Sequence, residues 1–141
     1  MEHFVIEIAI QELDALKDFL KVIRDERDAI ISFSLDGITR GNNRKEEILR
    51  KIEYLESEKE RLIKEMDDPD TVLRSERWVS ISGQSRPVVE EIKEALEKNM
   101  KLLSFSMDHV KSSVENIVGF INKATYGGKQ ERISYFPARE I

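Results

Sequence analysis

Cysteine is absent from this sequence of 141 residues, and proline and aromatic residues are scarce. Without cysteine the chain has no disulfide framework, no thiolate zinc site and no thiol nucleophile. This composition fits a reducing cytosol, because disulfide-stabilised folds belong to oxidising compartments. Three prolines and an aromatic content of 7% leave long stretches of the chain open to regular helix.

Long apolar runs are also missing from this chain, whose length suits a single domain. No run approaches the roughly 18 residues that a membrane-spanning helix requires. The first residues, Met1 to Glu7, carry acid where a secretory signal needs basic side chains. A net charge of −5 argues against nucleic-acid binding, which depends on clustered Lys and Arg. We expect a cytoplasmic protein that neither inserts into a membrane nor binds nucleic acid.

Catalytic and ligand-binding motifs do not assemble either. The two histidines, His3 and His109, lie far apart in the chain, and no Gly-x-Ser-x-Gly elbow is present. There is no phosphate-binding Gly-x-x-x-x-Gly-Lys-Ser/Thr motif and no dinucleotide fingerprint. We expect no catalytic residues, no metal site, no cofactor and no enzyme activity.

Charged residues make up 36% of the chain, and apolar residues recur among them at alternating steps of three and four. This spacing places them on one face of an α-helix. It predicts an all-α protein, an antiparallel bundle of three long helices near residues 4–33, 44–66 and 87–124. The face of the first helix comprises Ala9, Leu13, Leu16, Leu20, Ile23, Arg27 and Ile30.

The connections follow from turn-forming residues. Ser34 and Gly37 predict a chain reversal near Ser34, with a poorly formed start of the second helix before Arg44. Residues 69–85 predict an irregular connection or short helical turn, in which Trp78 and Ile81 cap the end of the bundle. Pro87 is expected to open the third helix, since its missing N–H is harmless in a first turn.

The third helix has a long periodic face that stops at Tyr126, before two glycines. Its polar member Asn99 is expected to fix the register of the helices, so that Asn99→Leu would leave the protein folded. The pattern predicts a helical domain over residues 1–125 and a flexible C-terminal tail over residues 126–141. The face comprises Val89, Ile92, Leu96, Asn99, Leu103, Ser106, Val110, Ser113, Ile117 and Phe120.

Apolar residues crowd the end of this third helix: Val114, Ile117, Val118, Phe120 and Ile121. Two interpretations stay open from the pattern. These residues pack on the first helix as core, or they offer a face to an amphipathic partner helix.

Taken together, local motifs make the chain resemble the FlgN family of flagellar type III export chaperones over nearly its whole length. The resemblance rests on their order: Leu35-Asp36 before Lys45, Ile48 and Leu49; Arg77-Trp78; Asn99-x-x-Leu102-Leu103; and Tyr126-Gly127. The segment after Gly128 has no counterpart in that pattern.

The resemblance implies a cytosolic chaperone that binds hook-associated proteins of the FlgK and FlgL kind and prevents their premature assembly. It implies delivery to the export gate, whose FlhA-like cytoplasmic domain reads the complex. By resemblance, Val114, Ile117, Val118, Phe120 and Ile121 bind the client, and Tyr126 docks on the gate.

Two other classes of protein remain alternatives to a chaperone. One is a helical coiled-coil adaptor or oligomerisation module without a secretion client, which would form a stable homo-oligomer. The other is a sensor or enzyme accessory domain, for example a four-helix bundle completed by a second copy.

Overall fold

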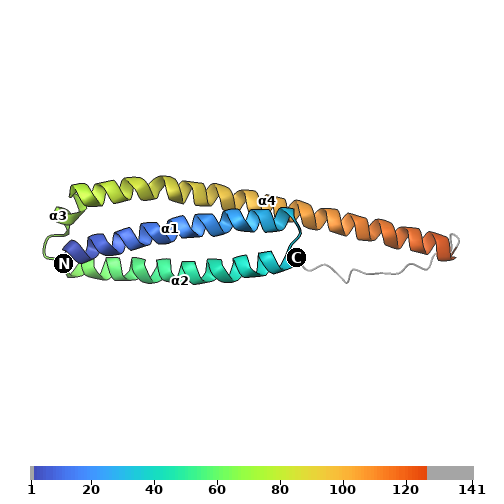
Figure 1. Ribbon diagram of the computed structural model, residues 1–141, viewed down its shortest axis with the longest axis horizontal. Helices are drawn as coiled ribbons and strands as arrows, with labels where there is room; N and C mark the ends of the chain where they lie inside the picture. The colour runs from blue at the N-terminus through green and yellow to red at the C-terminus, as the bar shows by residue number, and fades with distance from the viewer. Residues whose placement is uncertain (1, 127–141) are drawn as a thin grey trace. The chain divides into compact units, whose positions relative to one another are not determined.

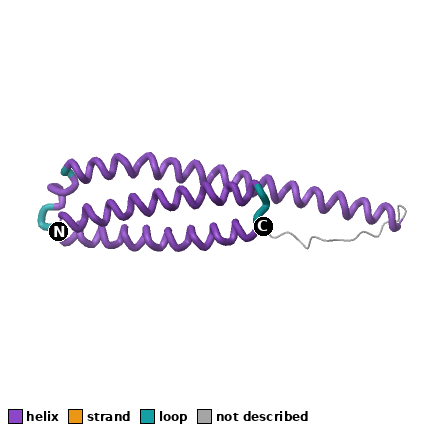
Figure 2. Tube along the Cα trace, viewed as in Figure 1, coloured by secondary structure: helices purple, strands orange, loops and turns teal. Residues whose placement is uncertain are grey.

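A computed structural model of the chain describes residues 2–126, and residues 1 and 127–141 lie outside the described part. Within residues 2–126, four helices follow one another: α1 (Glu2–Ile31), α2 (Leu35–Glu65), α3 (Pro69–Leu73) and α4 (Glu76–Tyr126). Figure 2 shows that only short connections separate them. The described residues form no strand, so the expectation of an all-helical protein is confirmed for them.

Helix α1 forms because its apolar residues occupy one broad face. Those buried include Leu13, Leu20 and Ile23, as the spacing predicts. Arg27, however, is exposed, and the neighbouring Glu26 is buried in its place. The burial of Glu26 is tolerated because this carboxylate has charged and polar partners inside the protein. An unpaired buried carboxylate would be strongly unfavourable.

The turn after α1 closes around a residue in the left-handed region. Phe33 has a φ of 56°, and the N–H of Ser34 donates to the carbonyl of Ala29 at 2.9 Å. A second bond runs from the Phe33 N–H to the Ile30 carbonyl at 3.1 Å. These two bonds make a Schellman motif, which usually places glycine where Phe33 stands. The reversal is therefore where the sequence predicts it, near Ser34.

Helix α2 begins at Leu35, so the expectation of a poorly formed start before Arg44 is wrong. The hydroxyl of Ser34 caps the helix by accepting from the Gly37 N–H at 3.0 Å. A Cβ on Gly37 would lie 2.9 Å from the Cβ of Ala29 in α1. Glycine, unfavourable in an isolated helix, here permits close packing of α2 on α1, and that packing stabilises the first turns.

The segment 69–85 is also more regular than predicted. It contains α3 and the first turns of α4, and Pro87 lies inside α4 rather than at its start. Proline removes the N–H that would bond to the carbonyl of Gly83. The helix continues through this defect because Trp78 and Ile81 before it, and Val88 and Ile92 after it, all pack on the core.

The chain divides into two compact units, Met1–Leu102 and Leu103–Ile141. In the first unit α1, α2 and the first part of α4 lie side by side (Figure 1). Lys59 of α2 pairs with Glu12 of α1, and Lys45 pairs with Glu26, so these two helices run antiparallel. The first part of α4 runs parallel to α1, since Trp78 packs near Val5 and Asn99 bonds to Ile23.

Two apolar clusters hold the first unit together. Trp78 and Ile81 pack against the second cluster, which bears out their predicted place at the end of the core. Each fully buried Leu, Ile or Phe stabilises the fold by roughly 1.5–3 kcal/mol. The first cluster comprises Ala15, Phe19, Leu20, Ile23, Ile48, Leu55 and Ile92; the second comprises Val5, Ile6, Leu62 and Val72.

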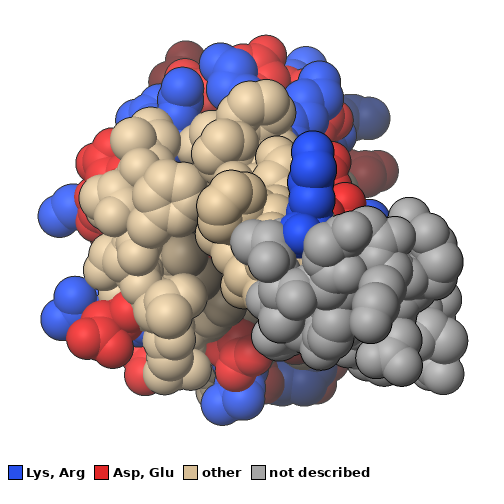
Figure 3. All heavy atoms as spheres, turned by 90° about the vertical axis from the view of Figure 1, so that its right-hand side faces the viewer, with Lys and Arg blue, Asp and Glu red and all other residues tan. Residues whose placement is uncertain are grey.

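Charged side chains of both signs cover the exposed faces of the helices. In the face drawn in Figure 3, Lys and Arg alternate with Asp and Glu along the margin instead of gathering by sign. Among the described helices, none contains a stretch long and apolar enough to cross a membrane.

Candidate functional site

The second unit carries a helix face that is apolar and open to solvent. Its described part is the end of α4, from Leu103 to Tyr126. Exposed fractions are 58% for Ile117, 73% for Phe120 and 38% for Ile121, three of the residues singled out in the sequence. The other two, Val114 and Val118, are half-buried. All five thus lie on one helix, and none belongs to the buried core.

This face extends further toward the N-terminus than the five predicted residues. Leu103, Met107 and Val110 are exposed by 41%, 65% and 50%. The sequence signal that marks them is a run of apolar residues at steps of four and three without a polar member. We call this run the open seam: Leu103, Met107, Val110, Val114, Ile117 and Ile121.

An exposed seam of this length needs a partner. Scattered apolar residues are normal on a protein surface, whereas a contiguous apolar strip marks an interaction site. The face offers side-chain contact rather than chemistry: within the described residues no three His, Cys, Asp or Glu side chains gather as a metal site. His109 is exposed on the same helix. The arrangement is suited to binding another apolar helix.

Tyr126 is the last residue of α4. Its side chain and the segment 127–141 lie outside the described residues. The assignment of Tyr126 as a docking residue, and the division of the chain at residues 125 and 126, therefore remain predictions.

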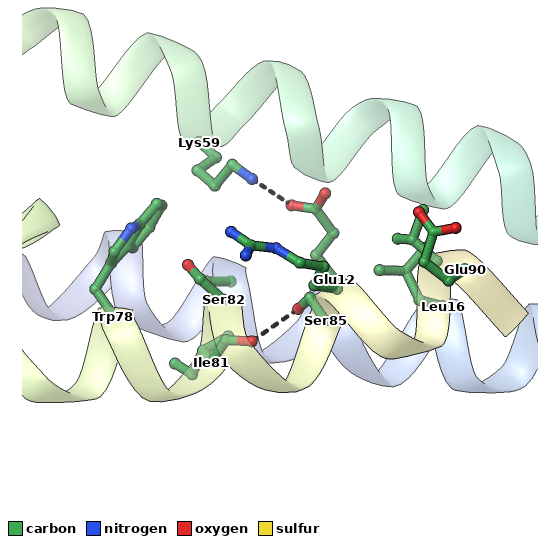
Figure 4. A pocket seen from close by; sticks show the side chains of 11 residues that line it. Glu12, Leu16, Lys59, Trp78, Ile81, Ser82, Ser85 and Glu90 are labelled. Atoms are coloured by element: carbon green, nitrogen blue, oxygen red, sulfur yellow. Dashed lines mark hydrogen bonds and ion pairs between the residues drawn. The ribbon is translucent and has the colours of Figure 1, made fainter.

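A second feature lies in the first unit, where α1, α2 and α4 surround a groove of about 340 Å³. Lys59 reaches into it and pairs with Glu12 at 2.9 Å (Figure 4). It also pairs with Glu56 of its own helix at 2.7 Å. The ammonium group of Lys59 also lies 5.7 Å from the ring centre of Trp78, within range of a cation–π contact. Trp78 thus joins α4 to α2 as well as capping the core.

The pKa values of the two carboxyl groups in this cluster shift in opposite directions. Burial raises the pKa of Glu12 to about 7, and its hydrogen bond with Glu56 adds to the rise. The same hydrogen bond lowers the pKa of Glu56. Burial opposes the charge on Lys59, but its hydrogen bonds to Glu56 and Glu12 prevail and raise its pKa. Sequence reasoning missed this cluster, because Glu12 on α1 lies far along the chain from Glu56 and Lys59 on α2.

A third feature is a polar chain that crosses the first unit. The amide of Asn99 in α4 donates to the Ile23 carbonyl at 2.8 Å and to the carboxylate of Glu26 at 3.2 Å. Glu26 in turn pairs with Lys45 of α2 at 2.6 Å. Asn99 is 4% exposed and Glu26 is 7% exposed. The polar position of Asn99 in the apolar pattern was visible in the sequence, but its partners were not.

Comparisons with known proteins place the chain in one family. No significant match was found among the curated proteins. None was found among the solved structures. The sequence model described as FlgN protein matches residues 1–132, nearly the whole length of the chain. This protein belongs to the FlgN family.

Proposed function

We propose that this protein is a cytosolic flagellar export chaperone that binds hook-associated proteins and delivers them to the export gate. Its family fits a chaperone role in flagellar protein export. The clients in this proposal are FlgK-like and FlgL-like proteins, kept from premature assembly while bound. In this proposal the first unit is the predicted antiparallel three-helix bundle, made of α1, α2 and the first part of α4.

The observation that carries the client-binding role is the open seam. Six aliphatic side chains at steps of four and three lie on a helix, with Met107 at 65% and Ile117 at 58% exposure. An amphipathic client helix would remove this surface from water, and burial contributes about 25 cal/mol per Å² of apolar area. A chaperone that covers the apolar side of a client helix prevents that side from packing against other client molecules.

Replacing Ile117 or Phe120 by Asp tests this role. Each substitution places a charge in the proposed contact and should weaken binding of a FlgK-like protein by at least about tenfold, or about 1.4 kcal/mol. Ser112→Asp is the matched control, because Ser112 is exposed and lies about 180° around α4 from Leu103. Isothermal titration calorimetry measures the affinities. Equal affinities for the Ile117→Asp and Ser112→Asp variants would reject client binding by this face.

Gate docking is assigned to Tyr126, on the basis of the family resemblance and its place at the end of α4. Tyrosine supplies a large contact area with few rotatable bonds, and two glycines follow it in the sequence. Tyr126→Ala should keep client affinity unchanged, weaken binding to an FlhA-like cytoplasmic domain and reduce client secretion. Loss of thermal stability, or unchanged affinity for the gate domain, would show that the residue is structural instead.

One observation favours a second candidate function. The open seam has the spacing of a coiled-coil strip, so a helical adaptor that pairs with itself would also cover it. Sedimentation equilibrium of the purified chain separates the two functions. A chaperone without its client stays largely monomeric at micromolar concentration, whereas an adaptor forms a stable oligomer whose affinity drops with Ile117→Asp.

A further inference from the structure

The apolar face of the second unit has two flanks. Leu103, Val110 and Ile117 form its centre at steps of seven. Each central residue is followed four positions later by a member of one flank and three positions later by a member of the other. At about 100° per residue, the two flanks are about 100° apart around α4. The first flank is Met107, Val114 and Ile121; the second is Ser106, Ser113 and Phe120.

The apolar face is wider around α4 than the surface that one partner helix covers. The aliphatic residues alone, from Ile117 round to Val118, span about 100° on a regular helix, and Phe120 widens the apolar arc to about 160° in the last turns, whereas Ser106 and Ser113 occupy the second flank before it. A strict two-helix seam is narrower, whereas a helix that contacts two neighbours has an apolar stripe at least about 100° wide. A single bound helix centred on the first flank would leave Phe120, which is 73% exposed, in water.

The first unit shows what the same helix does with a comparable arc. Ile92 of α4 belongs to one cluster with Phe19 of α1 and Leu55 of α2. Elsewhere in the first unit α4 contacts α1 through the Asn99–Ile23 hydrogen bond and α2 through Trp78 and Lys59, so it has two helical neighbours. Ala95 and Leu96, consecutive residues about 100° apart, are both packed against that cluster. In this protein, an apolar arc of about 100° on α4 therefore accommodates two neighbouring helices.

We propose that the face from Leu103 to Ile121 binds two helices of one client chain at the same time, one on each flank. This inference rests on the proposed chaperone function and adds the number of helices. The two sides are not equivalent. Ser106 and Ser113 are small and permit close approach of one helix, whereas Met107, Val114 and Ile121 hold the other at a larger distance, since interaxial distance depends on the side chains in contact.

The width of the face favours a pair of client helices over a second copy of this chain. Two copies related by twofold symmetry would pair the same patch with itself and set one α4 against one α4. That pairing covers a single seam and leaves a flank of each copy exposed. Residues 103–126 carry two acidic and two basic side chains, Asp108, Glu115, Lys111 and Lys123, so the apolar contact sets the preference rather than net charge.

Disulfide trapping tests the proposal, because the chain has no cysteine of its own. Ser113→Cys and Val114→Cys place thiols on consecutive residues of the two flanks. Each is mixed with a FlgK-like protein of the same bacterium that carries single cysteines along its terminal helical segments, under mild oxidation. A disulfide requires Cα atoms within roughly 7 Å, so each trap reports on the nearest helix only. Ser112→Cys, outside the apolar arc, is the matched control.

The expected result is two separate sets of client positions. Ser113→Cys should trap cysteines on one helix, Val114→Cys should trap cysteines on a second helix of the same client, and Ser112→Cys should trap at least tenfold less of either. If both variants trap positions within one or two turns of a single client helix, one helix occupies the face and the inference is overturned. Traps found only between chaperone copies would overturn it in favour of self-association.

A calorimetric titration separates failure of the proposed chaperone function from failure of the two-helix inference. The unmodified chain is first titrated calorimetrically with the FlgK-like and FlgL-like proteins. No binding in that titration would reject the proposed clients and, with them, the two-helix inference. Binding without trapping at either flank would place the client elsewhere on the protein and overturn the inference alone.

Discussion

Ile92 and Ile117 are the same residue type on the same helix, yet Ile92 is 8% exposed and Ile117 is 58% exposed. The first belongs to the unit that ends at Leu102, and the second to the unit that begins at Leu103. Both occupy an apolar face with helical spacing. Apolar spacing therefore predicts how wide the apolar face of a helix is. It does not predict whether other helices of the same chain or another molecule pack on that face.

The largest expected effect comes from placing a charge at each of these two positions. Ile92→Asp should destabilise the protein by about 3–5 kcal/mol, since it removes a buried side chain and buries an unpaired carboxylate. Ile117→Asp should change the free energy of unfolding by less than about 0.5 kcal/mol. Urea denaturation of both variants measures the difference. Equal destabilisation would mean that the open seam is part of the core.

Asparagine offers a second matched pair across the two units. Asn99→Leu should destabilise the protein by about 2 kcal/mol, because it removes a buried amide donor to Glu26 and to the Ile23 carbonyl and leaves Lys45 as the remaining partner of that carboxylate. The sequence alone predicts that this variant stays folded, and the buried hydrogen bonds of Asn99 add the expectation of a loss of stability. Asn116→Leu alters an exposed residue of the same helix and should leave stability nearly unchanged. If Asn99→Leu were as stable as the parent in urea, the polar chain through Glu26 would contribute little.

Acidity should affect the first unit through the Glu12–Glu56 pair. The pKa of Glu12 rises from 4.5 to about 7, so the folded state binds the proton more tightly than the unfolded state. This contribution is fully present below about pH 4.5 and is lost as the pH rises through 7. The lowered pKa of Glu56 acts in the opposite sense, losing stability as the pH falls. Because the pair titrates together, the net loss between pH 5 and 8 should be about 1–2 kcal/mol.

Thermal unfolding at several pH values measures that loss. Glu12→Gln removes the titrating group and should flatten the profile over this range. Glu53→Gln, a change of an exposed carboxylate on α2, serves as its control and should retain the slope of the parent. A Glu12→Gln variant with the parent's slope would assign the pH dependence to other groups.

The smallest expected effect concerns an exposed apolar residue of the first unit. Phe33 is 62% exposed and has a φ of 56°, a conformation that is unfavourable for a residue with a Cβ. Phe33→Gly should therefore stabilise the protein by about 1 kcal/mol. Ser32→Gly, at the preceding residue with an ordinary φ, should bring no such gain. A loss of stability in Phe33→Gly would show that the ring makes contacts that outweigh the strain.

Periodicity predicted the parts of this structure that depend on local spacing. It predicted the faces of α1 and α4 and the reversal near Ser34, because heptad spacing and capping residues act within a few positions of the chain. It failed at Gly37 and Pro87, where packing between helices overrides local propensity. It also included Arg27 in the apolar face of the first helix and left out Glu26, since the partners of Glu26 lie on two other helices.

The sequence predicted where the candidate residues lie along the helix, but not whether their side chains are buried or exposed. The spacing located Ile117, Phe120 and Ile121 on one helix end, and left open whether they were core or surface. Burial decides that question, and burial depends on which other segments reach the helix. The exposed values of these three residues resolve it for the described chain.

Asn99 is the α4 member of the polar chain that runs through Glu26 to Lys45. It lies three residues before Leu102, the last residue of the first unit. Buried bonds of this kind open only when the surrounding core opens, whereas an exposed helix frays by itself. Backbone amides of α4 should therefore exchange with deuterium slowly up to about Asn99 and rapidly beyond Leu103. The amides of one helix would then exchange at two different rates. A bound partner would slow the exchange of the amides beyond Leu103.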